Sequence, residues 1–549
     1  MLGSGAGGMT AALTAKTRGL DVLLVEKTEL IGGTTARSAG SVWVPNSHHS
    51  PAGNDSVEKT LTYLRGVIGN RLNEAMARAF LAAAPAMVDF LEGHTSVTFR
   101  PYAHHPDYEA KVDGATLSGR VLEPVPFDAS VLGNDFARLR PPLPEFTLLG
   151  GMMVDRIDIG HLLGATKSLA SLRHSADLLA RYAADRLRYA RGTRLKMGNA
   201  LAGRLYYSLL QRQVPILAPV RAQSLTQADG RVAGAVLETA DDKLVVRSRR
   251  GIVLATGGIS RSATLRQKLF PPALSAESPV AEGATGDGRA LGLEAGGHLG
   301  SDHANNGFWS PVSVRTRRDG STAVFPHFVL DRGKPGLIAV DGGGRRFVSE
   351  AVGYHQFVEA MLVADAGASI PFCYFICDHA FVAKYGLGMV RPGGFGLRRA
   401  VAEGYLTRAT SLEELAKVLG MPARELAATV ARHNGFAETG VDADFAKGSD
   451  AYQRNLGDPT HGPNPCIGSI ATPPFYALKI LPSDIGTSCG LVTNESAQVL
   501  RQDGSVVPGL YACGNDMNSI MAGHYPGPGI NIGPAMVFGF LAAQHAAGG

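Results

Sequence analysis

Apolar residues gather along the chain into short continuous runs and longer helical stretches, a pattern that predicts an α/β fold. The runs at 22–26 (VLLVE) and 251–255 (GIVLA) are typical of strands buried on both faces. Residues 220–258 also predict a hairpin with the turn ADGR. GLYACGN at 509–515 predicts another strand, and residues 530–547 predict a final apolar helix.

Changes in the pattern of predicted strands and helices along the chain predict its domain organisation. The first domain spans 1–299 and contains predicted helices at 56–93 and a basic helical insertion at about 155–215. Residues 300–475 mix strand and helix patterns and are predicted to form an inserted α+β domain. Residues 476–549 return to the first domain, so both ends of the chain contribute to its doubly wound sheet.

The first residues carry the spacing GxGxxG at Gly3, Gly5 and Gly8, and Glu26 ends the next apolar run. Gly3 permits a tight turn, Gly5 lets a pyrophosphate approach the backbone, and Gly8 lets the following helix pack on the sheet. Free N–H groups at the helix start face the phosphates, and Glu26 accepts hydrogen bonds from a ribose. The spacing therefore predicts a dinucleotide site, with a Gly-rich turn as the alternative.

The strand expected before these glycines is reduced to Met1 and Leu2. In a doubly wound sheet this strand is central. We therefore expect a misplaced start or a truncated first strand, with consequences for cofactor retention and stability.

Composition limits the class of protein. With 549 residues, 68 of them Gly, and 45% hydrophobic residues, the chain is typical of a soluble α/β enzyme. A net charge of +5 is too small to indicate nucleic acid. The five cysteines are scattered without metal-ligand spacing, so we expect no metal site, buried thiols and a reducing, cytoplasmic compartment. We find no secretory signal and no apolar run long enough for a bilayer.

Positive charge is concentrated between Lys167 and Arg212, where ten Lys or Arg accompany two Asp. The apolar spacing of this segment is helical. A basic amphipathic helix can lie on an anionic membrane, and the same pattern is typical of a solvated helical insertion. Both interpretations stay open, so peripheral membrane contact through 167–212 is one hypothesis.

Motifs spread over nearly the whole chain resemble those of the fumarate-reductase-type flavoproteins: GSGAGG, VEK, IGGTTARSAGSVWVPN, GIVLATGG, GRRFVSE and GLYACGN. Three further stretches resemble the 3-ketosteroid Δ1-dehydrogenase branch: HPDYEAKVDG, RRFVSEAVGYHQF and GHYPGPGINIGPAM. Ala39 departs from the family, which usually has glycine there. The resemblance implies a Rossmann-like FAD-binding domain with an inserted catalytic domain, FAD as the cofactor, and a small apolar ketone, a 3-ketosteroid, as the substrate. The electron acceptor is not readable from the sequence.

The resemblance also implies which residues contact the cofactor. These are Gly3, Ser4, Gly5, Ala6, Gly7, Gly8, Glu26, Lys27, Gly33, Thr34, Thr35, Ser38, Gly40, Ala222, Gly514, Asn515, Asn531 and Ile532.

Charge separates a ketone from a dicarboxylate substrate. A dicarboxylate needs cations, and arginine is the natural ligand because it binds carboxylates through two hydrogen bonds. No Lys or Arg follows Arg501, and the loop GHYPGPGINIG is neutral. This favours an uncharged carbonyl substrate, although Arg345 or Arg346 of the inserted domain remain candidates for a carboxylate ligand.

Δ1-dehydrogenation removes a proton α to the ketone and a hydride, which passes to the flavin N5. Two donors aimed at the carbonyl oxygen make the α-proton acidic, and one such donor is typically worth about 3–4 kcal/mol. We assign these donors to the Tyr525 hydroxyl and the Gly529 N–H, in the rigid segment YPGPG. The substrate is expected in an apolar slot between the FAD domain and 300–475.

The resemblance points to Tyr354 as the base, with Tyr108 as its hydrogen-bond partner. A free tyrosine has a pKa of about 10, so we expect the site to lower the pKa of Tyr354 by about two to three units. On residue type alone, His355 is the rival base.

Two alternative functions remain. One is a related flavoenzyme, such as a Δ4-(5α)-dehydrogenase or an enoate reductase. The other is a truncated FAD-binding protein without catalytic activity.

Overall fold

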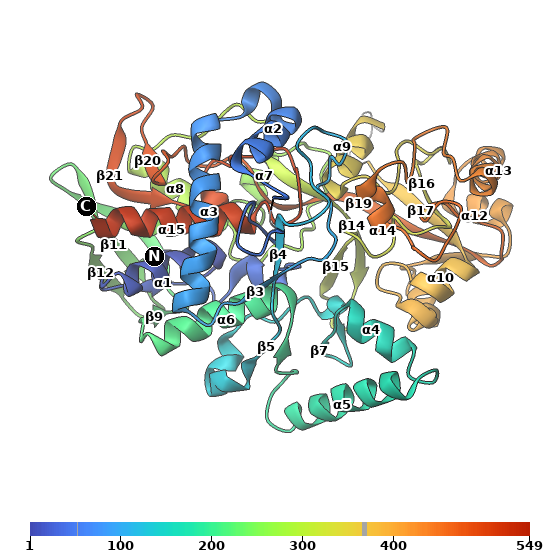
Figure 1. Ribbon diagram of the computed structural model, residues 1–549, viewed down its shortest axis with the longest axis horizontal. Helices are drawn as coiled ribbons and strands as arrows, with labels where there is room; N and C mark the ends of the chain where they lie inside the picture. The colour runs from blue at the N-terminus through green and yellow to red at the C-terminus, as the bar shows by residue number, and fades with distance from the viewer. Residues whose placement is uncertain (52, 365–370, 549) are drawn as a thin grey trace.

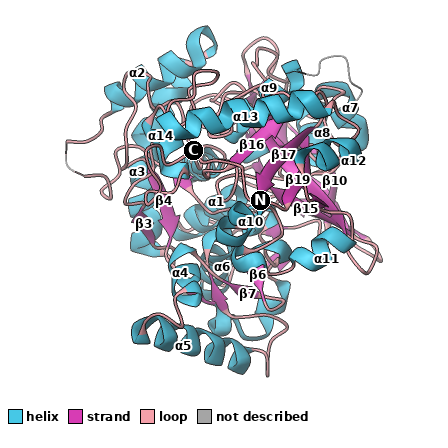
Figure 2. Cartoon of the chain, turned by 90° about the vertical axis from the view of Figure 1, so that its right-hand side faces the viewer, coloured by secondary structure: helices cyan, strands magenta, loops and turns pink. Residues whose placement is uncertain are grey.

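The computed structural model describes residues 1–51, 53–364 and 371–548. In Figure 1 the N-terminal segment (blue) and the C-terminal segment (red) lie together. Residues from about 300 to 475 (yellow to orange) form the other end of the molecule. Helices α4 (Arg156–Leu163) and α5 (Leu169–Asp185) project from one side in both Figure 1 and Figure 2. The fold is therefore α/β with segments from distant parts of the sequence in one domain.

The first domain is organised around a mostly parallel sheet. Its strands are β9 (Ile216–Leu217), β1 (Leu24–Val25), β13 (Ile252–Leu254), β21 (Val506–Ala512) and β20 (Gln498–Leu500). Leu2 joins the two halves of this sheet, because it forms parallel bridges to both Val25 and Leu254. The central strand predicted before the glycines is thus represented by a single bridging residue.

Helix α1 (Ala6–Thr17) packs against α15 (Ile532–Gly548) beside this sheet. Gly3 has φ +109°, and a Cβ there would lie 2.1 Å from the carbonyl oxygen of Ala255. A Cβ at Gly8 would lie 2.0 Å from the carbonyl oxygen of Gly3. Both positions therefore exclude a side chain, as the GxGxxG interpretation requires.

Smaller sheets and helices complete the first domain. The strands are β2 (Val42–Trp43), β3 (Phe99–Pro101), β4 (Val121–Pro124), β5 (Phe127–Asp128), β6 (Thr147–Leu148), β7 (Met152–Met153), β8 (Arg194–Leu195), β10 (Arg221–Ala228), β11 (Arg231–Glu238) and β12 (Lys243–Arg247). The helices are α2 (Val57–Ile68), α3 (Glu74–His94), α6 (Met197–Gln211), α7 (Ala263–Leu269) and α8 (Asp287–Glu294). The 3₁₀ helices are η1 (Gly33–Arg37), η2 (Gly69–Arg71), η3 (Ala129–Arg138), η4 (Pro144–Phe146) and η6 (Gly514–Asp516). The predicted hairpin is β10–β11, and the predicted helices at 56–93 are α2 and α3.

The region after residue 300 is built on a six-stranded sheet. Its strands are β14 (Gly307–Thr316), β15 (Thr322–Pro326), β16 (Leu337–Val340), β17 (Cys373–Asp378), β18 (Thr407–Ala409) and β19 (Phe475–Thr487). Its helices are α9 (Tyr354–Ala364), α10 (His379–Tyr385), η5 (Pro392–Gly394), α11 (Leu397–Ala402), α12 (Leu412–Leu419), α13 (Ala423–Thr439) and α14 (Ala451–Leu456). β19 begins at Phe475 and pairs with β14 and β17, so this sheet continues to Thr487, past the predicted boundary of 475.

The basic segment 167–212 is not one solvated insertion. Helix α5 is largely exposed, and Leu169 is 82% exposed. Helix α6, by contrast, is buried along most of its length, because it packs against η1 and α1. The interpretation of 167–212 as a solvated insertion is wrong for α6, because it rested on the number of Lys and Arg and overlooked the apolar residues of this helix.

All five cysteines are buried free thiols, as expected. Within the described residues, no helix combines the length and the apolar character that a membrane crossing requires.

Candidate functional site

One cavity of about 1460 Å³ runs between the first domain and the region after residue 300. Its wall includes Gly5 of the N-terminal segment, Met153 beside the insertion, Phe328 of the second sheet region and Tyr525 near the C-terminus. Typical ligand pockets measure about 300–1,000 Å³. This cavity is large enough for a dinucleotide and a substrate together.

The predicted cofactor residues converge on this cavity. Those that line it are Gly3, Ser4, Gly5, Ala6, Gly7, Glu26, Lys27, Gly33, Thr34, Thr35, Ser38, Gly40, Ala222, Gly514, Asn515, Asn531 and Ile532. Gly8 does not line it and instead packs against the Gly3 carbonyl group.

The start of α1 forms a cradle suited to a pyrophosphate. Gly5 is the N-cap residue and offers no side chain to the first turn. A Cβ at Gly5 would meet only Thr35 Oγ1, 3.9 Å away, so the space in front of the helix is open. Amide groups at such a helix start favour an anion. The residues present therefore fit the diphosphate of FAD.

Two charged groups behind this cradle are held by protein partners. The Glu26 carboxylate accepts hydrogen bonds from Ser4 N (3.1 Å), Ser4 Oγ (2.6 Å) and Thr28 N (2.8 Å). Lys27 Nζ lies 2.5 Å from Asp287 Oδ2. Ser4 and Thr28 thus fix the Glu26 carboxylate at the cavity edge, and the Lys27 charge is compensated.

The three predicted catalytic tyrosines form one aromatic cluster in the cavity wall. The ring centroids of Tyr354 and Tyr525 are 5.0 Å apart, those of Tyr108 and Tyr354 are 5.5 Å apart, and those of Tyr108 and Tyr525 are 5.7 Å apart. Phe328 closes the cluster with its ring centroid 5.0 Å from that of Tyr354. Segments more than 400 residues apart in the chain thereby bring three hydroxyl groups together.

The loop that carries Tyr525 is anchored at Pro526. The Pro526 carbonyl oxygen accepts hydrogen bonds from the Tyr63 hydroxyl (2.6 Å) and from the Tyr108 N–H (3.0 Å). Tyr108 and Tyr525 are therefore held in a fixed relation by one carbonyl group.

Gly529 lines the same cavity with an unused donor. Its φ is +91°, and a Cβ there would lie 2.6 Å from Trp43 N. Its carbonyl oxygen accepts a hydrogen bond from that Trp43 N–H at 3.3 Å. No acceptor within the described residues takes a hydrogen bond from the Gly529 N–H. This amide is free for an oxygen atom in the cavity.

Burial keeps the phenols neutral in the empty site. It raises the pKa of Tyr354 well above its ordinary value, and the neighbouring Tyr108 and Tyr525 raise it further. Burial also raises the pKa of Tyr108 and that of Tyr525. The expectation of a lowered pKa for Tyr354 is wrong, because desolvation raises this pKa and the hydrogen bonds with Tyr525 and Tyr108 raise it as well.

His355, the rival base, points away from the cavity. Its Nδ1 accepts a hydrogen bond from Trp309 N at 2.9 Å. Its Nε2 faces Asn305 Nδ2 at 3.2 Å and Glu359 Oε1 at 3.5 Å. The ring is occupied on both nitrogens and does not line the cavity.

Arg345 and Arg346, the candidate carboxylate ligands, are also excluded from the cavity wall. Arg346 pairs with Glu350 at 2.9 Å and with Asp442 at 2.8 Å. Arg345 Nε lies 3.4 Å from Glu425. Both guanidinium groups serve ion pairs of the second sheet region.

Sequence reasoning missed most of the cations in the cavity wall, among them Arg156 and Lys334. Lys334 Nζ donates to the Gly457 carbonyl oxygen at 2.6 Å. No carboxylate of the described residues lies within ion-pair distance of Arg156 or Lys334. Burial and the charge of Arg156 lower the pKa of Lys334. Neither residue belongs to a motif, so the sequence carried no signal for them.

Comparison with known proteins places this geometry among flavoproteins. The family described as FAD binding domain matches residues 1–532. A 4-oxocyclohex-2-ene-1-carboxylate 5-dehydrogenase of Sinomonas cyclohexanicum is 36% identical over 100% of this chain and 93% of its own. A 3-oxosteroid 1-dehydrogenase of Mycobacterium tuberculosis is 35% identical over 100% of this chain and 97% of its own.

A solved structure has the same fold. The crystal structure of 3-ketosteroid Δ1-dehydrogenase from Sterolibacterium denitrificans in complex with 1,4-androstadiene-3,17-dione is 34% identical to this chain, with a TM-score of 0.92. The match covers 100% of this chain and 98% of that one.

Proposed function

Since the chain belongs to the family of FAD-binding flavoproteins that includes the 3-oxosteroid 1-dehydrogenases, we propose that it is an FAD-dependent enzyme that introduces a double bond beside the ketone of a 3-ketosteroid. The observation that carries this proposal is the cluster of Tyr108, Tyr354 and Tyr525 beside the free Gly529 amide. These groups are neutral, and they suit a carbonyl oxygen rather than a carboxylate.

The donors act on the ketone oxygen. The Tyr525 hydroxyl and the Gly529 N–H both donate to it, and they stabilise the negative charge that develops there as the α-proton leaves. Gly529 is fixed by its contact with Trp43, and Tyr525 by the anchored loop. The donors are therefore positioned before the reaction begins.

Tyr354 takes the proton from the carbon α to the ketone. Its phenolate oxygen forms the new O–H bond as the C–H bond breaks, and the phenol later returns this proton to solvent. Tyr108 lies against Tyr354 and orients it. FAD, held by the cradle at α1, supplies the acceptor for the hydride from the neighbouring carbon.

A second candidate substrate class is a cyclic ketone with a carboxylate. The Sinomonas relative is named for a 4-oxocyclohexene carboxylate. The observation in its favour is the uncompensated pair Arg156 and Lys334 in the cavity wall. Both belong to the insertion and the second sheet region rather than to the cofactor cradle, so they would contact the end of a substrate away from the ketone oxygen.

One substrate panel tests both candidates. Purified enzyme is reduced anaerobically with androst-4-ene-3,17-dione, with 4-oxocyclohexane-1-carboxylate or with its methyl ester, and products are identified by mass and double-bond position. We expect the steroid to bleach the flavin and to give the Δ1 product. Bleaching by none of the ketones contradicts the proposal, and so does an enzyme that converts 5α-androstane-3,17-dione to the Δ4 product but leaves androst-4-ene-3,17-dione unchanged.

The Lys334→Met variant tests whether Arg156 and Lys334 bind a substrate carboxylate. If they bind a substrate carboxylate, kcat/KM for the acid falls about 10- to 100-fold, because a hydrogen bond to a charged group is lost, while the ester and the steroid are unaffected. Arg318→Gln, which removes an exposed charge outside the cavity wall, is the matched control. Equal losses for acid and ester would remove this second candidate.

We also propose that the α4–α5 region contacts a membrane surface. Exposed apolar side chains gather there: Leu149, Ile157, Leu163, Leu169, Leu172, Leu179 and Leu187. Leu149, Ile157, Leu163 and Leu179 also line the cavity. Lys167, Arg186 and Arg188 are exposed beside them. Apolar side chains with adjacent cations favour an anionic lipid surface, from which an apolar ketone would enter the cavity.

Vesicle sedimentation tests the membrane proposal. We expect the enzyme to sediment with phosphatidylglycerol vesicles at low salt and to be released by high salt. The Leu169→Asp/Leu187→Asp variant loses about tenfold or more of this affinity, because two leucines no longer enter the lipid. Val441→Asp, at an exposed valine elsewhere, should bind normally. Wild-type enzyme that stays in the supernatant at low salt contradicts the proposal.

A further inference from the structure

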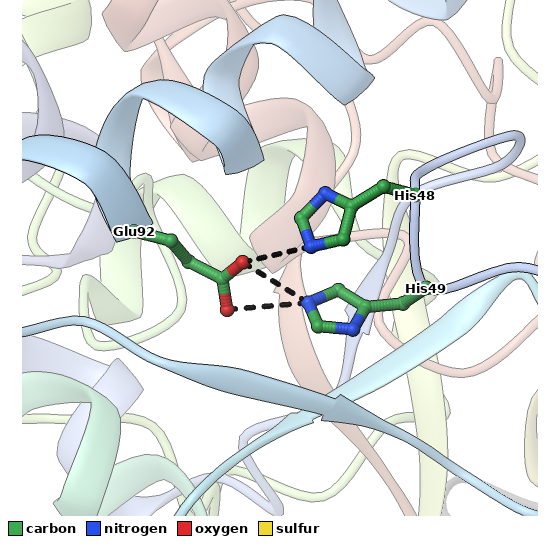
Figure 3. A group of neighbouring side chains, drawn as sticks. All are labelled: His48, His49 and Glu92. Carbon is green, nitrogen blue, oxygen red and sulfur yellow. Dashed lines mark hydrogen bonds and ion pairs between the residues drawn. The ribbon is translucent and has the colours of Figure 1, made fainter.

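Outside the cavity, His48, His49 and Glu92 form a compact cluster. The histidines follow β2, Glu92 lies on α3, and Figure 3 shows both imidazole rings turned toward the carboxylate. Nε2 of His48 and Nε2 of His49 each lie 3.1 Å from Glu92 Oε2. Within the part of the chain that the structure describes, this is the one group of three or more His, Cys, Asp or Glu side chains whose ligand atoms all lie within 4.8 Å of one another.

The separations are close to those around a single ion. Zinc binds imidazole nitrogen and carboxylate oxygen at about 2.0–2.2 Å, so ligand atoms in a tetrahedral site lie roughly 3.3–3.5 Å apart. The two rings lie side by side with centroids 4.0 Å apart. A small outward movement of these side chains therefore makes room for the ion.

Carboxylates lie beside both ring nitrogens of His48. Asp89, one turn before Glu92 on α3, lies 2.7 Å from His48 Nδ1. In a neutral ring whose Nδ1–H donates to Asp89, Nε2 carries a lone pair. In that tautomer, a cation between Nε2 and the Glu92 oxygen 3.1 Å away would bind both atoms. The Phe99 N–H holds the other oxygen of Glu92 at 2.7 Å.

An acid on the far nitrogen of the ring is the usual partner of a metal-bound histidine, because it fixes the tautomer and the ring orientation. From this geometry we propose that His48, His49 and Glu92 bind a divalent first-row metal ion such as Zn²⁺. Water completes the coordination, since the His48 side chain is 49% exposed.

The site is structural. None of its three ligands lines the cavity. The ion joins the segment after β2 to α3, and β2 carries the Trp43 N–H that donates to Gly529. Metal binding therefore supports the strand behind the proposed oxyanion donor without touching substrate.

Calorimetric titration with Zn²⁺ tests the proposal. Tag-free holoenzyme with bound FAD is treated with a chelator and then titrated. We expect one ion per chain and a Tm that rises with Zn²⁺ concentration, because the ion binds only the folded chain. Glu92→Gln and His49→Asn abolish this binding. Asp89→Asn weakens it about 10- to 100-fold, as the loss of an outer partner does.

His94→Gln is the matched control, because His94 is an exposed histidine on the same helix whose ring contacts Phe90 and lies outside the proposed ligand set. It should bind Zn²⁺ like the wild type. FAD content and the zinc-free Tm, measured for every variant, report folding separately. Wild-type enzyme that binds no Zn²⁺ overturns the proposal, and so does unchanged affinity in both folded ligand variants.

Discussion

We expect the Tyr525→Phe variant to lose about 10²- to 10³-fold in kcat, the usual effect of removing one oxyanion donor. In the proposed mechanism the hydroxyl of Tyr525 is one of two donors to the ketone oxygen, and the Gly529 N–H alone would leave most of the developing charge unstabilised. FAD content should stay near one per chain, because the cofactor cradle at α1 does not involve this hydroxyl. Steady-state kinetics with androst-4-ene-3,17-dione and flavin absorbance measure both quantities.

Tyr452→Phe is the control for this experiment. Tyr452 belongs to the same aromatic group, with its ring centroid 4.4 Å from that of Tyr108, but its hydroxyl is buried without a hydrogen-bond partner and does not line the cavity. It should retain wild-type kcat. A Tyr525→Phe enzyme that turns over at the wild-type rate would remove Tyr525 from the oxyanion site.

The second large effect is expected at the base. Tyr354→Phe should lower kcat by about 10²- to 10⁴-fold, the range typical of general base catalysis. The variant should still bind the steroid and shift the flavin spectrum, because the donors to the ketone remain. Wild-type activity in this variant would transfer the base role to another group.

The pH dependence has a defined sign. Tyr354 acts as the phenolate, and burial raises its pKa above the ordinary value of about 10. The ionised fraction therefore increases with pH across the neutral and alkaline range, and kcat should rise with it rather than pass through a maximum near neutrality. A profile that titrates near pH 6.5 would instead indicate an imidazole base.

The same shift bears on stability. A tyrosine with a raised pKa in the folded state contributes stability below about pH 10, where it is protonated in both states. This contribution is lost as the pH rises above that value, because the unfolded chain ionises first.

The nucleotide-binding start could be predicted from the sequence because its constraints are local. A Cβ at Gly8 would clash with the carbonyl oxygen of Gly3, five residues earlier in the chain, so the spacing itself records this part of the fold. The strands β13 and β21 were predictable for the same reason, since a continuous apolar run indicates burial on both faces.

Long-range contacts were less accessible. That Leu2 alone bridges Val25 and Leu254 depends on strands more than 200 residues apart. The burial of α6 depends on its packing against α1 and η1. Lys334 and Arg156 lie in segments without motifs, so their meeting at the cavity wall was not readable.

The three proposed catalytic tyrosines were identified through the family resemblance. The direction of the Tyr354 pKa shift was not predicted correctly. The proximity of Tyr108, Tyr354 and Tyr525 agrees with the assigned roles. This direction depends on how deeply the Tyr354 phenol is buried and on the direction of its hydrogen bonds with Tyr108 and Tyr525, which only the packed structure reveals.

A crystal structure of the FAD-bound enzyme with androst-4-ene-3,17-dione tests the central claim most directly. The account predicts the ring ketone oxygen about 2.7–3.1 Å from both the Tyr525 hydroxyl oxygen and the Gly529 nitrogen, the range of an oxyanion site. A steroid whose ring ketone oxygen lies elsewhere in the cavity, beyond hydrogen-bond distance of both groups, would contradict it.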